Sequence, residues 1–255
     1  WTGEGSDDFW STAANWNGQV PATGDTVTFE GSNRQANYND ISDLIVQSIT
    51  FNNGGFNISG VPLGVSDSIT SLDGVNTFTV DLNWDSTVTK SWNVAENSEV
   101  LLANNTSIEV NGNHELNGGG TLKVTGNMSI GVTTPSAIPA FIVNEGRHVI
   151  DGGTFTSRGG YRIGSSDVAA LGAETILTNG ANFTLLVSGG NLRVGDSANP
   201  VASRLIVDNS TLTMSGGELG IPYNASATGE VLQNGGLVSG AVVNMRARGT
   251  YVLKD

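Results

Sequence analysis

The apolar residues of this chain recur in short alternating runs, which predict β-strands rather than helices. A period of two places every second side chain on one face of an extended segment, and each run spans only a few residues. Clusters of glycine and asparagine end the runs at 53–55, 117–120 and 234–236, as expected for tight turns. Representative runs are Val27 and Phe29, Ile49 and Phe51, Leu122 and Val124, and Leu212 and Met214.

A degenerate repeat occupies the second half of the chain. The segment Gly-Gly-Tyr-Arg-Ile-Gly at 159–164 returns as Gly-Gly-Asn-Leu-Arg-Val-Gly at 189–195, and again as Gly-Gly-Glu-Leu-Gly at 216–220. Repeats of about 20–30 residues, built from strands and turns with loops of variable length, are typical of a β-solenoid. A β-sandwich or an up-and-down barrel is the alternative, although neither needs paired glycines at matching places.

The first thirty residues differ from the repeats because they contain three tryptophans, Trp1, Trp10 and Trp16. The end of a solenoid exposes both its core and its strand edges, so a bulky segment must cover it. We therefore predict one all-β domain over 1–255, a right-handed parallel β-helix with an aromatic N-terminal cap at 1–30 and coils at 31–255. The start at Trp1, without methionine or signal sequence, suggests a mature segment or a module of a longer protein.

The opening pattern W-T-G…F-W-S-T-A-A-N-W…P…G-D-T-V-T-F resembles the entry motif of large secreted bacterial β-helix proteins with autotransporter-associated strand repeats. Later stretches such as Gly-Gly-Thr-Leu-Lys-Val-Thr-Gly at 119–126 fit the same style. The resemblance implies a bacterial protein that is secreted or held at the cell surface. Within that group, a module of this size is similar to the β-helical xylan-binding carbohydrate-binding modules of gut bacteria. That similarity implies binding without hydrolysis, beside a catalytic domain of a larger secreted enzyme, and it transfers no individual ligand residue.

Composition restricts the possible partners. The formal charge of −13 comes from 24 acidic against 11 basic residues, and no basic stripe is present. Nucleic acid and acidic membranes are therefore poor partners, and a neutral polysaccharide fits better than an anionic one. The chain has no cysteine, which excludes disulfides and thiolate metal sites, and no apolar run approaches the roughly 20 residues of a membrane helix.

No recognisable catalytic constellation occurs, so we expect no enzyme activity and no cofactor. Glycoside hydrolysis needs two carboxylates about 5–10 Å apart in a cleft, but the adjacent Asp7 and Asp8 lie in the predicted cap. His114 and His148 are isolated from nucleophile or metal-ligand motifs. A structural calcium ion, shared for example by Asp40 and Asp43, stays open at this point.

Candidate glycan-binding residues are the aromatic side chains outside the cap, because sugar rings stack on exposed aromatic faces. Trp84 falls at a strand end beside Asp85, where its ring could tip outward. Trp92 lies two residues before Val94, which favours an inward position and packing. Tyr223 follows Pro222 in a variable loop.

The repeat also predicts a column of polar side chains. Ile163, Val194 and Leu219 should point inward, so Arg162, Arg193 and Glu218 should point outward and align on successive coils, extended by Arg246. The column is either a solvated charge ladder or the floor of a binding groove with Tyr161 or Tyr223 as a stacking wall. Three functions follow: a carbohydrate-binding module, a structural or adhesive segment of a surface protein, or a β-helix polysaccharide hydrolase or lyase.

Overall fold

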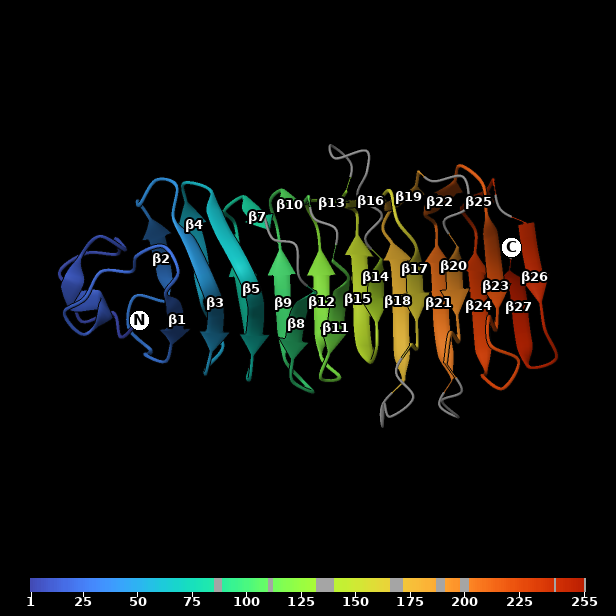
Figure 1. The fold of residues 1–255 in the computed structure, drawn as a ribbon, viewed down its shortest axis with the longest axis horizontal. Helices are drawn as coiled ribbons and strands as arrows, with labels where there is room; N and C mark the ends of the chain where they lie inside the picture. The colour runs from blue at the N-terminus through green and yellow to red at the C-terminus, as the bar shows by residue number, and fades with distance from the viewer. Residues whose placement is uncertain are drawn as a thin grey trace.

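The computed structural model describes residues 1–84, 89–109, 112–131, 140–165, 172–186, 191–197, 202–240 and 242–254. These residues form 27 strands and one short 3-10 helix, η1 (Ala13–Trp16). The strands stack side by side into a rod, with the N-terminal segment at one end and the C-terminal strands at the other (Figure 1). The paired strands run parallel throughout the two sheets, which confirms the parallel β-helix. The alternatives, a β-sandwich and an up-and-down barrel, are built from antiparallel strands and are therefore excluded. The predicted repeat residues Gly189 and Gly190, together with Asp85, lie outside the described residues.

One side of the rod is a ten-stranded sheet, called sheet A, to which successive coils contribute one strand each. Its strands neighbour each other in chain order, so each rung contacts only the rung before and the rung after. The strands are β2 (Ala36–Asn39), β4 (Asn57–Gly60), β6 (Val75–Phe78), β9 (Glu99–Leu102), β12 (Thr121–Val124), β15 (Gly146–Asp151), β18 (Ala173–Thr178), β21 (Ser203–Asp208), β24 (Gly229–Asn234) and β27 (Gly249–Lys254).

The other two sides belong to a 17-stranded sheet that bends at a corner. Two long strands, β3 (Ile45–Phe51) and β5 (Leu63–Ser71), cross the corner, since β5 pairs with β7 through its first residues and with β8 through its last. Face B1 contains β7 (Leu82–Trp84), β10 (Thr106–Ile108), β13 (Asn127–Ile130), β16 (Thr154–Ser157), β19 (Asn182–Leu185), β22 (Thr211–Met214) and β25 (Leu237–Ser239). Face B2 contains β1 (Thr26–Phe29), β8 (Lys90–Val94), β11 (His114–Asn117), β14 (Phe141–Val143), β17 (Tyr161–Ile163), β20 (Leu192–Val194), β23 (Glu218–Ile221) and β26 (Val242–Met245).

Inward side chains form columns along the rod axis, because in-register pairing repeats the same position on each rung. Leu116, Val143, Ile163 and Val194 are one such column on face B2, and all four are fully buried. Each buried aliphatic side chain contributes about 1.5–3 kcal/mol of transfer free energy. The alternation of apolar and polar residues in the sequence is the direct record of this arrangement.

The aromatic cap is present as predicted. The rings of Trp1, Trp10 and Trp16 lie around Phe29, with centroid distances of 6.4, 5.8 and 5.6 Å. The Trp10 indole also donates a hydrogen bond to Asn37 Oδ1 at 2.7 Å. Strand β1, within the block 1–30, pairs with β3, so the last residues of that block already form the first rung of face B2.

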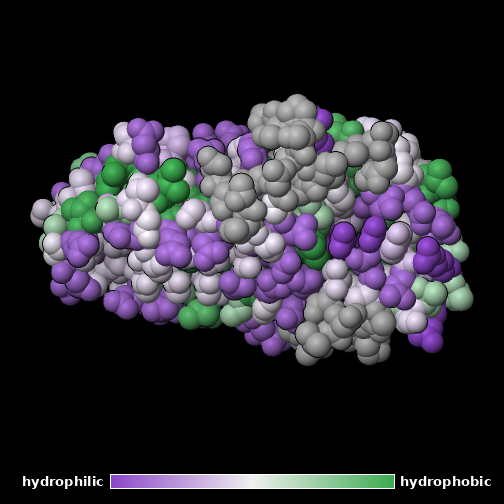
Figure 2. All heavy atoms as spheres, viewed as in Figure 1, coloured by the Kyte–Doolittle hydropathy of each residue, from purple (hydrophilic) through white to green (hydrophobic). Residues whose placement is uncertain are grey.

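At the opposite end the inward positions of the last coil are uncovered. Val243 and Met245 of β26 are 45% and 52% exposed, although their partners on the preceding coil, Leu219 and Ile221, are fully buried. Val242, in register with the outward-facing Glu218, is 70% exposed. Figure 2 shows hydrophobic residues at this end of a surface that is otherwise mostly hydrophilic or intermediate. Among the described residues, no helix is long and apolar enough to cross a membrane.

The core also encloses ionisable groups. Lys90 and His114 face each other on neighbouring rungs, and both are fully buried. Burial lowers the pKa of His114 to about 3, with a smaller contribution from the Lys90 ammonium, and neither ring nitrogen has a hydrogen-bond partner. His148 is likewise buried, and burial lowers its pKa to about 3. Its Nδ1 lies 2.5 Å from the Tyr161 hydroxyl, which also contacts Thr175 Oγ1 at 2.9 Å.

Candidate functional site

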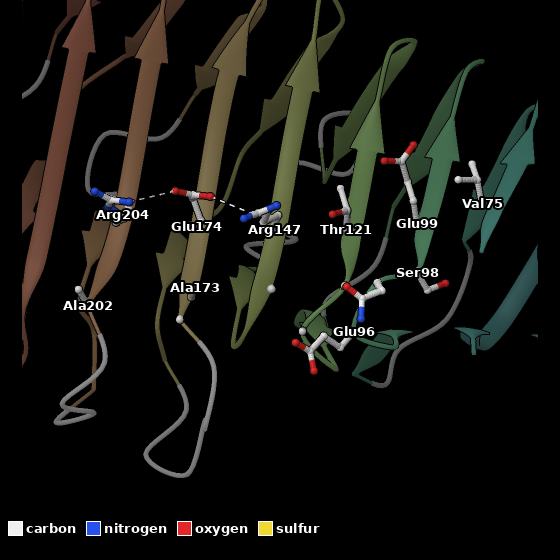
Figure 3. A pocket seen from close by; sticks show the side chains of 15 residues that line it. Val75, Glu96, Ser98, Glu99, Thr121, Arg147, Ala173, Glu174, Ala202 and Arg204 are labelled. Atoms are coloured by element: carbon white, nitrogen blue, oxygen red, sulfur yellow. Dashed lines mark ion pairs between the residues drawn. The ribbon is translucent and has the colours of Figure 1, made fainter. Parts of the chain in front are cut away.

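A groove of about 500 Å³ runs along the corner where face B2 turns into sheet A. It crosses the beginnings of the strands from β6 to β21, so its long direction follows the rod axis (Figure 3). The lining residues come from successive coils, and each coil repeats the same positions. A hollow of this shape suits an extended ligand better than a compact one.

The floor of the groove is made of small residues. Gly120, Gly146 and Ala173 stand one residue before the outward-facing position of their strands, and Gly146 pairs with Ala173. A Cβ at Gly120 would lie 2.3 Å from Ala95 O, and one at Gly146 would lie 2.4 Å from Gly120 O. Gly146 also has a φ of +83°, which favours glycine. At Gly120 and Gly146 the groove is therefore open because the backbone beneath it leaves no room for a side chain.

One wall of the groove is a column of charged side chains on sheet A, visible in Figure 3. Arg147 Nε lies 3.2 Å from Glu174 Oε2, and Arg204 Nη1 lies 3.9 Å from Glu174 Oε1. Arg204 Nε contacts Glu230 Oε2 at 2.7 Å, and this hydrogen bond raises the pKa of Arg204 above its usual value. The column in register is Val75, Glu99, Thr121, Arg147, Glu174, Arg204 and Glu230.

An aliphatic stripe lies beside this charged column. Its residues occupy the next outward position, two residues further along each strand, and all are half-buried. Lys123 continues the same column on the preceding rung, in register with Val149, and its Nζ pairs with Asp151 Oδ2 at 2.6 Å. Asp151 stands at the next outward position, so polar groups border the stripe on both sides. The stripe consists of Val149, Ile176, Ile206, Leu232 and Val252.

From Glu99 to Glu230 this surface offers a hydrogen-bonding side chain at each rung, about 4.8 Å apart, next to an apolar strip. Guanidinium and carboxylate groups are planar and multidentate, and they suit ligands with many hydroxyl groups. Glu174 is shared by two arginines, which leaves this carboxylate poorly placed to act as a free acid or base. In the part of the chain that the structure describes, no group of three His, Asp or Glu side chains is placed to hold a metal ion.

Three of the predicted binding aromatics are core residues. Trp84 is 4% exposed, and Trp92 and Tyr161 are fully buried, so the idea that the Trp84 ring tips outward is wrong, as is Tyr161 as a stacking wall. Trp84 follows the inward parity of Leu82 and packs on Trp92, with ring centroids 4.4 Å apart. The inward position of Trp92 that its spacing to Val94 favoured is confirmed.

The predicted arginine column forms in part. Arg162 and Arg193 are direct neighbours on face B2. Asp196 lies between them, 3.1 Å from Arg193 Nη1 and 3.8 Å from Arg162 Nε, and it also accepts a hydrogen bond from Ser165 Oγ at 3.1 Å. The pair is thus held by an acidic residue that the repeat pattern did not single out.

Glu218 does not belong to that column, which corrects the prediction. The residue opposite Arg193 is Gly220, because Leu219 pairs with Leu192 and the unit at 216–220 lacks the arginine position. The aromatic ring of Tyr223 covers Gly220 instead: a Cβ there would lie 2.8 Å from Tyr223 Cδ2.

Tyr223 is a packing partner for arginines rather than a free stacking wall. The Arg193 guanidinium carbon lies 3.9 Å from the ring centroid, and that of Arg246 lies 5.1 Å from it. Arg246 also donates to the Tyr223 carbonyl. Cation–π contacts of this kind hold the loop after Pro222 against the last coils.

The charged wall of the groove was missed from the sequence, although a signal for it exists. The segments Arg-His-Val-Ile-Asp at 147–151, Glu-Thr-Ile-Leu-Thr at 174–178, Arg-Leu-Ile-Val-Asp at 204–208 and Glu-Val-Leu-Gln-Asn at 230–234 all start with a charged residue. Aligning them would have placed the four charges in one column. Asp40, one of the two residues considered for calcium, accepts hydrogen bonds from Ser11 N and Oγ at 2.9 and 2.5 Å.

No protein-family model, no curated protein and no solved structure matches the chain. The geometry of the groove and the chemistry of its wall are therefore the basis on which a function is assigned.

Proposed function

We propose that this chain is a non-catalytic carbohydrate-binding module that holds a neutral plant cell-wall polysaccharide, of the xylan type, along the groove of sheet A. The observation that supports this most is the direction of the groove, which crosses successive rungs from β6 to β21. Five rung intervals correspond to about 24 Å, a length suited to several linked sugars rather than to one.

The charges of the wall favour an uncharged ligand. Arginine and glutamate alternate from Arg147 to Glu230, so a uniformly charged polymer would meet repulsion at every second rung. The net charge of −13 adds to the repulsion of a polyanion. A neutral sugar chain can instead donate hydroxyl hydrogens to the carboxylates and accept hydrogen bonds from the guanidinium groups.

The proposal includes secretion and attachment to a catalytic domain, for which the binding module would supply proximity to the substrate. Tethering an enzyme to its polymer raises the effective concentration of the bonds to be cleaved. No cofactor is required for such a role.

Affinity electrophoresis against soluble xylan, mixed-linkage glucan, mannan and pectate, with a parallel assay for released sugars, tests the proposal. We expect retardation by xylan, none by pectate, and no products. Arg147→Ala and Arg204→Ala should each weaken xylan binding about tenfold, the loss of a hydrogen bond to a charged group. Arg162→Ala, on face B2, is the matched control and should bind as the parent protein does.

Each other outcome has a defined meaning. Weaker binding in Arg162→Ala alone would move the ligand to the arginine column of face B2. The absence of retardation on all four polymers would overturn the proposal and favour a structural or adhesive segment. Released reducing ends or unsaturated products would identify a hydrolase or a lyase.

A further inference from the structure

Two aromatic rings are exposed at the cap end of sheet A. Phe9 is 45% exposed and Tyr38 is 42% exposed, whereas the remaining aromatic rings of the described residues are buried or half-buried. The two rings meet edge to face, with centroids 5.8 Å apart and planes at 88°. Tyr38 projects outward because Asn37 and Asn39, on either side of it in β2, point inward.

The backbone beneath these rings is held firmly. Phe9 and Tyr38 form a parallel bridge, so the cap segment lies beside β2 like an additional strand. Trp10 N donates to Tyr38 O at 3.0 Å, and Tyr38 N donates to Asp8 O at 2.9 Å. A ring pair that is held in place before a ligand arrives loses little conformational freedom on binding.

Polar groups stand on the same short segments as the rings. Arg34 Nη1 pairs with Asp8 Oδ1 at 2.8 Å, next in sequence to Phe9. Ser11 donates to Asp40 two residues after Tyr38. Apolar ring surface with carboxylate and guanidinium groups nearby matches a sugar ring, which has an apolar C–H face and hydroxyl groups at its rim.

We propose that Phe9 and Tyr38 form a second carbohydrate subsite, on which a pyranose ring of the polysaccharide stacks. This inference rests on the proposed function. The subsite lies two rungs from Val75 at the end of the groove, about 10 Å along the axis. It also lies four residues further along the strand direction, about 13 Å across sheet A, because Ala36 is in register with Asn57 and Asn57 with Thr77. A long polymer on sheet A would engage both places and bind more tightly than a short oligosaccharide that fits only one.

Isothermal titration calorimetry with soluble xylan and with short xylo-oligosaccharides tests the subsite. Phe9→Ala and Tyr38→Ala should each weaken binding of soluble xylan about five- to tenfold, since one stacking contact is lost. Tyr38→Phe keeps the ring and should bind as the parent does. Thermal unfolding of each variant separates lost binding from a disturbed cap.

A second measurement uses the unaltered protein. Tyr38 is the exposed tyrosine, so nitration by tetranitromethane should modify it first, and saturating xylan should protect it. An unchanged nitration rate with xylan bound, or Ala variants that bind as the parent does, would overturn the subsite and leave the groove in place. Loss of binding in the ring variants but not in Arg147→Ala or Arg204→Ala would support the subsite and overturn the groove. A parent protein that binds no polymer overturns both.

Discussion

Acidification should destabilise this protein because two core residues are histidines held neutral in the folded state. Burial lowers the pKa of His114 and of His148 to about 3, from 6.5 in an unfolded chain. Between these pH values the unfolded state therefore binds protons at both histidines and the folded state does not. As a result, the free energy of unfolding falls as the pH drops from about 6.5 toward 3. Above pH 6.5 both states are neutral at these positions and the effect vanishes.

The magnitude follows from the pKa difference. One pH unit corresponds to 1.36 kcal/mol per group, so each histidine gives a slope of about 1.4 kcal/mol per unit between roughly pH 6 and 4. At pH 4.5 the loss is about 3 kcal/mol for each histidine and about 5–6 kcal/mol for both. That is comparable with the total stability of many domains.

Urea unfolding followed by tryptophan fluorescence, at half-unit steps from pH 4.5 to 7.5, measures this slope. His114→Leu removes a ring whose two nitrogens have no partner, so the variant should be at least as stable as the parent at pH 7 and should lose about half of the acid slope. A His114→Leu slope equal to that of the parent would refute the reasoning, and would assign acid sensitivity to the carboxylates instead.

Three further predictions concern the core and the groove. Lys90→Met removes the buried ammonium beside His114 and should raise the pKa of His114, measured by NMR titration of its ring protons. An unchanged or lower pKa of His114 would contradict the placement of Lys90. Gly146→Val should destabilise the fold by more than about 2 kcal/mol in thermal melts, because the position has a positive φ and a Cβ would strike Gly120 O. The control Gly24→Ala also has a positive φ but open space around it, and it should cost only about 1 kcal/mol in the same melts. Glu174→Ala should change the free energy of unfolding by less than about 1 kcal/mol, because its partners Arg147 and Arg204 are 63% and 45% exposed. Any loss of xylan retardation in this variant would therefore reflect lost binding rather than unfolding.

The fold was accessible from the sequence because its physical cause is local. Alternating residues such as Leu122 and Val124 face one side of a strand wherever that strand pairs, and both are buried. Three tryptophans before the first rung have no place in a regular coil, so the cap could be recognised as well. Both features can be predicted without knowing the register between strands of neighbouring rungs.

The site was less accessible because it depends on register between coils. Glu218 and Arg193 share a place in the repeat, but the shorter unit at 216–220 puts Gly220 opposite Arg193. Trp84 shows a second difficulty. The alternation with Leu82 predicts that its side chain points inward, as observed, whereas its position at the end of a strand suggested an outward ring. The groove arises from tight turns at Gly120 and Gly146, whose paths depend on contacts with the preceding rung.

Because each rung pairs only with its neighbours, the length of this molecule can change during evolution in steps of one coil. Duplication or loss of one coil would lengthen or shorten sheet A by about 4.8 Å and add or remove one wall position such as Arg147 or Glu174. Neither change would disturb the cap, which contacts only the first rungs. Binding length and ligand chemistry can therefore diverge coil by coil while the fold stays the same.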